Sequence, residues 1–132
     1  MKINSEQEMI KIGASFFDAR IIELIGDVGV GKTTFVRGLG TKLGVKEPIT
    51  SPSYTISKSY ACDNGKTLVH YDFYRLKDPG LMMEDLRENL ENPDNVVVVE
   101  WSDSVKNILP EERTIINIKY NDDGSRELER IQ

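Results

Sequence analysis

Residues 26–33 read Gly-Asp-Val-Gly-Val-Gly-Lys-Thr and match the phosphate-binding pattern GxxxxGK[ST] at every fixed position. The glycines let successive peptide N–H groups point into one concavity, and a helix beginning near Lys32 adds the positive end of its dipole. In such a loop the lysine reaches the β- and γ-phosphates of a nucleotide, and the Thr33 hydroxyl binds Mg²⁺. We therefore expect these residues to contact a nucleotide: Asp27, Val28, Gly29, Val30, Gly31, Lys32, Thr33 and Thr34.

Hydrolysis by such a loop requires an acid near the Mg²⁺, at the end of a buried strand. Glu100 directly follows four consecutive valines, at positions 96–99. A charged residue there lies either at a strand end or in a costly buried position. The pattern predicts that Glu100 holds Mg²⁺, directly or through a water molecule. The alternative is a strand end that simply faces solvent.

A second candidate acid, Asp72, lies in the segment Val-His-Tyr-Asp-Phe-Tyr at positions 69–74. Alternation along a strand places Val69, Tyr71 and Phe73 on one, apolar face. It places His70, Asp72 and Tyr74 on the opposite, polar face. If that polar face borders the nucleotide, Asp72 orients the attacking water or a Mg²⁺-bound water. The alternative is an aspartate that ends the strand and caps the following turn.

Other polar and aromatic residues near these acids carry weaker signals. His70 is the only histidine, which excludes a histidine-rich metal site, and it is expected to be packed or hydrogen-bonded within the strand. Arg75 fits either a phosphate contact or an ordinary ion pair. Trp101 follows Glu100 and fits either the core or a cover over the site.

The chemistry-bearing residues must be positioned by an α/β fold, since the apolar periodicity alternates between two and 3.6 residues along the chain. The phosphate loop joins a short apolar strand at 21–25 to a helix at 32–43. Further helices are expected at 6–18, 80–92 and 102–109. Further strands are expected at 54–60, 66–74, 96–100, 113–120 and 125–131. We predict a mixed sheet, parallel near the phosphate loop, with antiparallel hairpins around it.

The composition bounds the class of protein. The 132 residues fit a single domain, 1–132, with 39% hydrophobic and 30% charged residues. A net charge of −5 disfavours a broad surface for DNA or another polyanion. One cysteine, the lack of signal-peptide features at the start and the absence of a long apolar run together predict a cytoplasmic protein without a membrane segment.

Four segments in this order resemble the TsaE family, the P-loop ATPases of bacterial tRNA threonylcarbamoyladenosine biosynthesis. They are GDVGVGKTT at 26–34, SPSYT at 51–55, HYDFYR at 70–75 and VEW at 99–101. The phosphate loop alone is shared by many families, whereas the ordered set is specific. The likeness covers nearly the whole chain.

The resemblance implies an ATPase that binds ATP or ADP with Mg²⁺ and joins the TsaD and TsaB proteins. It implies contact with tRNA only through that complex, whose repeated turnover the hydrolysis supports. Carried onto matching positions, Lys32 and Thr33 bind phosphate and Mg²⁺, and Asp72 and Glu100 are the acids needed for hydrolysis. Trp101 lies beside the nucleotide or a partner, and the loop at 51–55 acts as a switch over the γ-phosphate.

Two departures from the family pattern stand out. Ser53 replaces the usual threonine and keeps a hydroxyl group. The segment at 80–86 begins Gly-Leu-Met-Met where the family usually has acidic residues followed by a glycine. The second departure bears on a partner contact, so no partner residues are assigned there.

Three other functions remain open from the sequence. A small-molecule kinase shares the loop but needs a second substrate pocket and usually an arginine-bearing lid, for which the chain offers little room. A GTPase needs an Asn-Lys-x-Asp element, which this sequence lacks. A docking module that binds nucleotide without hydrolysing it is compatible with the same motifs.

Overall fold

The computed structural model describes residues 1–52, 56–74, 76 and 78–132. Within these residues, seven strands form one mixed sheet in the order β1-β7-β6-β2-β5-β4-β3. Neighbouring strands are parallel from β6 to β4 and antiparallel at both edges. The strands are β1 (Lys2–Ile3), β2 (Ile21–Ile25), β3 (Ser57–Ala61), β4 (Thr67–Asp72), β5 (Asn95–Glu100), β6 (Thr114–Tyr120) and β7 (Arg126–Arg130).

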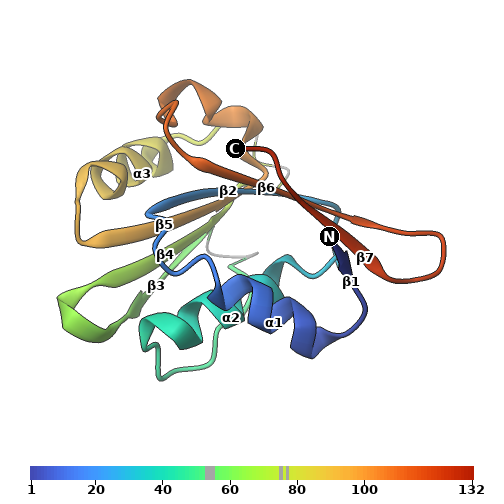
Figure 1. Cartoon of the computed structure of the whole chain (residues 1–132). Coiled ribbons are helices and arrows are strands. Elements are labelled where there is room, and N and C mark those ends of the chain that lie inside the picture. The colour runs from blue at the N-terminus through green and yellow to red at the C-terminus, as the bar shows by residue number, and fades with distance from the viewer. Residues whose placement is uncertain (53–55, 75, 77) are drawn as a thin grey trace.

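Helices cover both faces of this sheet (Figure 1). Helices α1 (Glu6–Ala14) and α2 (Lys32–Leu43) lie together on one face, and α3 (Leu81–Glu91) lies on the other. Short 3₁₀ turns are found at Asp63–Gly65, Ser102–Ser104 and Lys106–Ile108. The fold class and the arrangement of parallel and antiparallel strands predicted from the sequence are thereby confirmed.

Several predicted bounds differ from the observed ones. The first helix ends at Ala14 rather than at 18, because Ser15 caps it and the chain then turns. The helix predicted at 102–109 is two 3₁₀ turns, and the strand predicted at 66–74 ends at Asp72. The short strand β1 was not predicted, since its two residues are too few to show a period. Part of the strand predicted at 54–60 lies outside the described residues.

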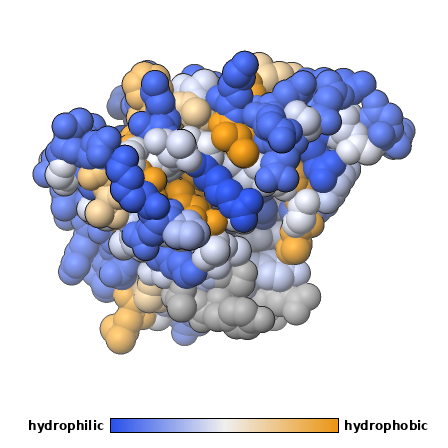
Figure 2. Space-filling model, turned by 90° about the horizontal axis from the view of Figure 1, so that it is seen from below, coloured by the Kyte–Doolittle hydropathy of each residue, from blue (hydrophilic) through white to orange (hydrophobic). Residues whose placement is uncertain are grey.

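Each face of the sheet carries its own apolar core. Alternate residues of β2 separate the two cores: Ile22 and Leu24 pack under α1 and α2, whereas Ile21 packs with α3 and the turn at 102–108. The four valines at 96–99 divide in the same way, two to each core. The outer face seen from below is mainly hydrophilic, with a few apolar side chains between the polar ones (Figure 2). Burial on both faces explains why β2 and β5 read as nearly continuous apolar runs.

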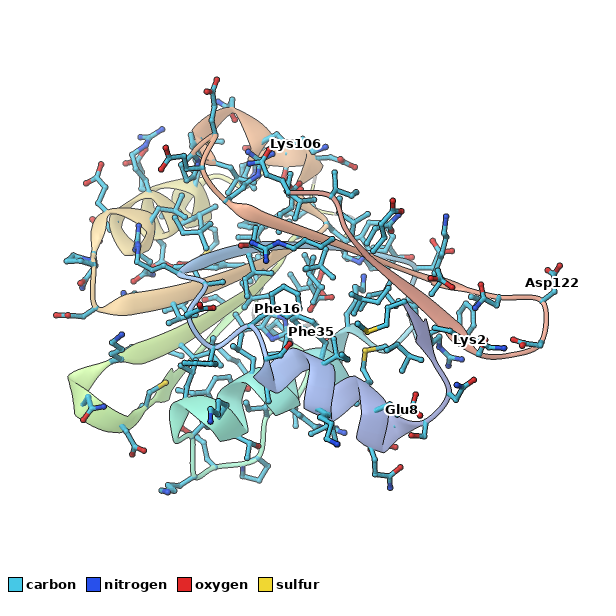
Figure 3. The ribbon with its side chains drawn as sticks, viewed as in Figure 1. Lys2, Glu8, Phe16, Phe35, Lys106 and Asp122 are labelled. Carbon is cyan, nitrogen blue, oxygen red and sulfur yellow. The ribbon has the colours of Figure 1, made fainter. Side chains whose placement is uncertain are left out.

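Helices α1 and α2 approach each other closely because glycines face the partner helix. A Cβ atom on Gly13 would lie 2.1 Å from the carbonyl oxygen of Phe35, and one on Gly38 would lie 2.0 Å from that of Ile10. The rings of Phe16 and Phe35 meet beside this contact, with centroids 5.5 Å apart (Figure 3). The contact holds the start of α2, and with it the phosphate loop, in a fixed place.

Candidate functional site

The phosphate loop lies between the end of β2 and the start of α2, as the sequence predicts. Gly29 and Gly31 have φ angles of 81° and 116°, a region that side-chain-bearing residues rarely adopt. Gly26 allows close approach to β6, because a Cβ atom there would lie 2.5 Å from the carbonyl oxygen of Ile118. The glycines are therefore required by this loop conformation itself.

The predicted phosphate-contacting residues differ in how far their side chains are exposed to solvent. Val30 is fully buried in the core under α1 and α2 and offers only its main chain to a ligand. Asp27 and Val28 are exposed, while Thr33 and Thr34 are half-buried in the first turn of α2. A pocket of about 310 Å³ adjoins the loop and is lined by Gly29, Val30, Gly31 and Thr34 together with residues of β1, α1 and β7.

Lys32 has only 5% of its surface exposed and folds back over the loop. Its ammonium donates a hydrogen bond of 2.5 Å to the carbonyl oxygen of Gly26 and lies 3.4 Å from Oε1 of Glu100. It also lies 4.4 Å from the centroid of the Trp101 ring, a cation–π distance. The lysine and the acid predicted from separate motifs are therefore in contact.

Glu100 is buried at the carboxyl end of β5, with 3% of its surface exposed. Its other oxygen, Oε2, accepts a hydrogen bond from Nε2 of His70, which is fully buried on β4. Burial alone would raise the pKa of Glu100, but the contacts with His70 and Lys32 outweigh it and hold the pKa below its usual range. The carboxylate is thus kept charged inside the fold.

Asp72 lies directly opposite Glu100 in the parallel pairing of β4 with β5. It is half-buried, and burial raises the pKa of its carboxyl group; the hydrogen bond from the Tyr74 amide opposes this shift and the charge of Glu100 adds to it. The predicted apolar face of this strand is confirmed, since Val69, Tyr71 and Phe73 are all buried.

The polar face of β4 differs from the prediction at His70. We expected His70, Asp72 and Tyr74 to meet at one surface, but His70 is enclosed beneath the loop helix and bonded to Glu100. Only Asp72 and Tyr74 reach solvent. The expectation of a hydrogen-bonded strand histidine is confirmed.

Trp101 combines the two roles that the sequence left open. It is partly buried against the core on the α3 side, and its ring packs on that of Tyr74 with centroids 4.7 Å apart. Its main chain has a φ of 53°, a left-handed conformation that turns the chain sharply after Glu100. The ring thereby covers the ammonium of Lys32.

A buried network that the sequence analysis missed supports this turn. Glu23 of β2 accepts hydrogen bonds from the Ser102 hydroxyl and, over 2.8 Å, from Nε of Arg113. Burial opposes ionisation of Glu23, yet these two donors lower the pKa of its carboxyl group overall. A glutamate inside the apolar strand Ile-Ile-Glu-Leu-Ile was the available signal, because a buried charge requires partners.

Two further residues missed by the sequence analysis contact the loop from the β6–β7 hairpin. The Tyr120 hydroxyl donates to the carbonyl oxygen of Gly29 over 2.6 Å, and Nε of Arg126 donates to that of Val30 over 2.9 Å. No motif marks them, because any residue's carbonyl group can accept such bonds.

The donor set fits Mg²⁺ bound together with a nucleotide. Mg²⁺ usually keeps several waters and takes one or two protein oxygens besides the phosphates. The Thr33 hydroxyl lies in the first turn of α2, directly after the loop, and the charged Glu100 ends β5, the strand paired with β2. The described residues contain no cluster of three or more acidic, histidine or cysteine ligands. These residues suit a metal held mainly by phosphate and water.

Some predicted features fall outside the described residues. Arg75 and the switch residues at 53–55 are among them. Of the switch segment, Ser51 is exposed and Pro52 is buried.

Comparison with known proteins gives a consistent family. The family model described as "Threonylcarbamoyl adenosine biosynthesis protein TsaE" matches residues 3–128. A Haemophilus influenzae protein described as "tRNA threonylcarbamoyladenosine biosynthesis protein TsaE" is 36% identical, covering 98% of this chain and 86% of its own length. A Bacillus subtilis protein with the same description is 38% identical, covering 82% of this chain and 66% of its own length. The crystal structure of Bacillus subtilis YdiB matches with a TM-score of 0.78 at 30% identity, covering 97% of this chain and 80% of that one.

Proposed function

We propose, given that the chain belongs to the TsaE family, that it binds and hydrolyses ATP with Mg²⁺ and supports formation of threonylcarbamoyladenosine in tRNA. The observation that carries the ATPase proposal is the contact between Lys32 and Glu100 behind a glycine loop. Phosphoryl transfer by such loops uses a lysine on the β- and γ-phosphates and a strand-end acid for Mg²⁺, and this chain holds those two residue types in contact.

In this proposal Lys32 exchanges its present acceptors for phosphate. Its ammonium, bonded to the Gly26 carbonyl oxygen and close to Glu100, moves onto the β- and γ-phosphates when nucleotide binds. Phosphate oxygens, which carry more negative charge than a carbonyl, compete well for this donor. The Trp101 ring excludes water from the ammonium and strengthens its attraction to the phosphates.

Glu100 and Thr33 are proposed to hold Mg²⁺, which when bound neutralises charge on the β- and γ-phosphates. Both oxygens of Glu100 already have partners, Lys32 and His70. The His70 contact keeps one oxygen turned inward after Lys32 leaves. Oε1, which now contacts Lys32, would then be the oxygen available to Mg²⁺ or to one of its water ligands.

Asp72 is proposed to orient the water that attacks the γ-phosphate. Its place opposite Glu100, at the exit of β4, puts it at the same carboxyl end of the parallel strands as the loop. The bond that it accepts from the Tyr74 amide fixes one oxygen and leaves the other to bind water. Its ionised form is the one that accepts a proton or a water hydrogen.

The biological role is proposed from the relatives. The proteins described as TsaE are named for biosynthesis of threonylcarbamoyladenosine in tRNA. We propose that this chain acts in the cytoplasm with TsaD and TsaB proteins, and meets tRNA only through their complex. Among the described residues, no helix has the length and apolar character that crossing a bilayer demands.

An ATPase assay of the purified protein, alone and with a TsaD–TsaB pair, tests the proposal. We expect slow phosphate release alone and strong stimulation by the pair, with no other phosphate acceptor added. Labelling of an added metabolite would indicate a kinase instead. ATP binding without phosphate release, with or without the pair, would indicate a docking module that only binds nucleotide.

A further inference from the structure

The outer side of the phosphate loop is held by the hairpin formed by β6 and β7. This hairpin extends past the end of the sheet, with Asp122 at its tip (Figures 1 and 3). Two of its side chains donate hydrogen bonds to main-chain carbonyl groups of consecutive loop residues, Gly29 and Val30. A hairpin side chain that fixes a carbonyl group also fixes the peptide N–H on the opposite side of the same peptide plane.

The peptide unit joining Gly29 to Val30 is fixed at both ends. Its carbonyl group accepts from the Tyr120 hydroxyl, and its N–H donates to the carbonyl oxygen of Asp27 over 3.2 Å. Gly29 itself has a positive φ and would otherwise sample many conformations. These two bonds restrict rotation next to a glycine of the loop.

In the next peptide unit, within the part of the chain that the structure describes, only the carbonyl group has a hydrogen-bond partner. Nε of Arg126 holds the Val30 oxygen, so the trans geometry directs the N–H of Gly31 away from the hairpin. Gly31 precedes the first residue of α2, and its N–H is one of those expected to meet phosphate. The hairpin thus presets a donor that the nucleotide requires.

Tyr120 and Arg126 support each other before any ligand binds. They are register partners in the antiparallel pairing of β6 with β7, and the guanidinium carbon lies 4.1 Å from the ring centroid. Arg126 also donates from Nη1 to the carbonyl oxygen of Gly124 over 2.7 Å, and pairs with Ile3 of β1 on its other side. The pair is therefore placed by the sheet and not by the loop that it contacts.

We propose that Tyr120 and Arg126 are positioning residues that shape the phosphate loop before the nucleotide arrives. The inference rests on the proposed nucleotide binding and adds how the loop is kept ready for it. A glycine-rich loop that must be ordered on binding loses affinity to conformational entropy, and a loop ordered beforehand does not. The predicted effect is on the binding of any phosphate chain, with or without a nucleoside.

Arg126 also lines the pocket beside the loop, so a direct contact with the nucleoside is the competing explanation. The two explanations differ in their prediction for a ligand that lacks a nucleoside. If the residues position the loop, their substitution lowers the affinity for inorganic tripolyphosphate and for ATP by the same factor. If Arg126 contacts the nucleoside, its substitution lowers the affinity for ATP but not for tripolyphosphate.

The test compares Tyr120→Phe and Arg126→Gln with the wild-type full chain by calorimetric titration, using Mg-tripolyphosphate and Mg-ATP. Tyr120→Phe removes only the hydroxyl, and we expect affinity for both ligands to fall about three- to tenfold. Arg126→Gln removes a charge-assisted bond, and we expect a fall of about tenfold or more for both. Arg130→Gln is the matched control: it removes the same charge from the same strand and should leave both affinities unchanged.

Amide hydrogen exchange without ligand gives a second measurement that does not depend on binding. We expect the amides of 28–31 to exchange faster in Tyr120→Phe than in wild type, while those of β2 and β5 keep their rates. Loss of ATP affinity alone, or unchanged affinity for both ligands, would overturn the positioning role. A wild-type protein that binds neither ligand would refute the proposed function itself, and the inference with it.

Discussion

The phosphate loop has two flanks that are built from different chemistry. We call the side formed by His70, Asp72, Glu100 and Trp101 the catalytic flank, and the side formed by Tyr120 and Arg126 the hairpin flank. The catalytic flank brings buried charges together, with Lys32 between Glu100 and the Trp101 ring. The hairpin flank contacts the loop through hydrogen bonds to two of its main-chain carbonyl groups.

This difference indicates that the catalytic flank can affect the rate of the proposed hydrolysis, whereas the hairpin flank can affect only the affinity for the nucleotide. Charges held in a low-dielectric site change the energy of a developing phosphoryl charge. Bonds to carbonyl groups fix the shape of the loop equally before and during the reaction, so they affect the bound ground state and transition state alike. Substitutions on the two flanks should therefore separate in their effects on affinity and on rate.

The largest expected effect is that of Lys32→Ala, whose ammonium lies within the catalytic flank between Glu100 and Trp101. We expect ATP hydrolysis to fall at least about a hundredfold, because the phosphates lose their buried cation. Phosphate release with saturating TsaD–TsaB pair measures it. Lys42→Ala, an exposed lysine of the same helix, is the control. Hydrolysis that survives in Lys32→Ala would contradict the placement of the phosphates at this loop.

Asp72→Asn should show most clearly that the catalytic flank affects the rate of hydrolysis more than the affinity for ATP. It keeps the shape of the side chain but removes the charge that orients water, so we expect hydrolysis to fall about a hundredfold while ATP affinity changes less than about threefold. Titration and phosphate release on the same sample measure both quantities. Asp94→Asn, near the opposite end of β5, should change neither. A parallel loss of affinity would make Asp72 a binding or structural residue.

How much the sequence predicts depends on how local each feature is. The phosphate loop is a local motif between a strand and a helix, so its place was predicted in full. The contact of Lys32 with Glu100 was not, because it depends on β5 lying next to β2 while the chain passes through β3 and β4 between them. The residues at 102–109 were predicted as one helix from local pattern, yet they form two 3₁₀ turns after the sharp bend at Trp101.

The hairpin flank shows a second limit of prediction. Tyr120 and Arg126 lie six residues apart across a polar turn, and their partners are carbonyl groups, which carry no sequence signature. Their contacts with the loop follow only from the register of β6 with β7. Residues that act through the main chain of a motif are therefore the ones that motif analysis misses.

Thr33→Ala tests whether the two flanks differ in how their effect on ATP affinity depends on Mg²⁺. Removing the hydroxyl removes one proposed ligand of Mg²⁺, so we expect ATP affinity to fall about tenfold with Mg²⁺ and about twofold in EDTA. Hairpin-flank variants, in contrast, should lose affinity equally in both conditions. Titrations with and without Mg²⁺ measure the difference, and Thr41→Ala, exposed on the same helix, is the control. Equal losses for Thr33→Ala would remove it from the metal site.

The smallest expected effect concerns the support beneath the catalytic flank, where Glu23 holds Ser102 and Arg113. The pKa of Glu23 is lowered in the fold, so its stabilising contribution is present above the usual glutamate pKa of about 4.3 and is lost as the pH falls through the lower folded pKa. Glu23→Gln should therefore lower the free energy of unfolding by about 2 kcal/mol at pH 7 and by less in acid. Urea unfolding at pH 7 and pH 3 measures this, with Glu129→Gln on β7 as control. Because the hairpin flank contains no carboxylate, acid should loosen the turn at Trp101 before it loosens the loop's contacts with Tyr120 and Arg126. If the difference in unfolding free energy between wild type and Glu23→Gln were the same at both pH values, the network would not depend on the charge of Glu23.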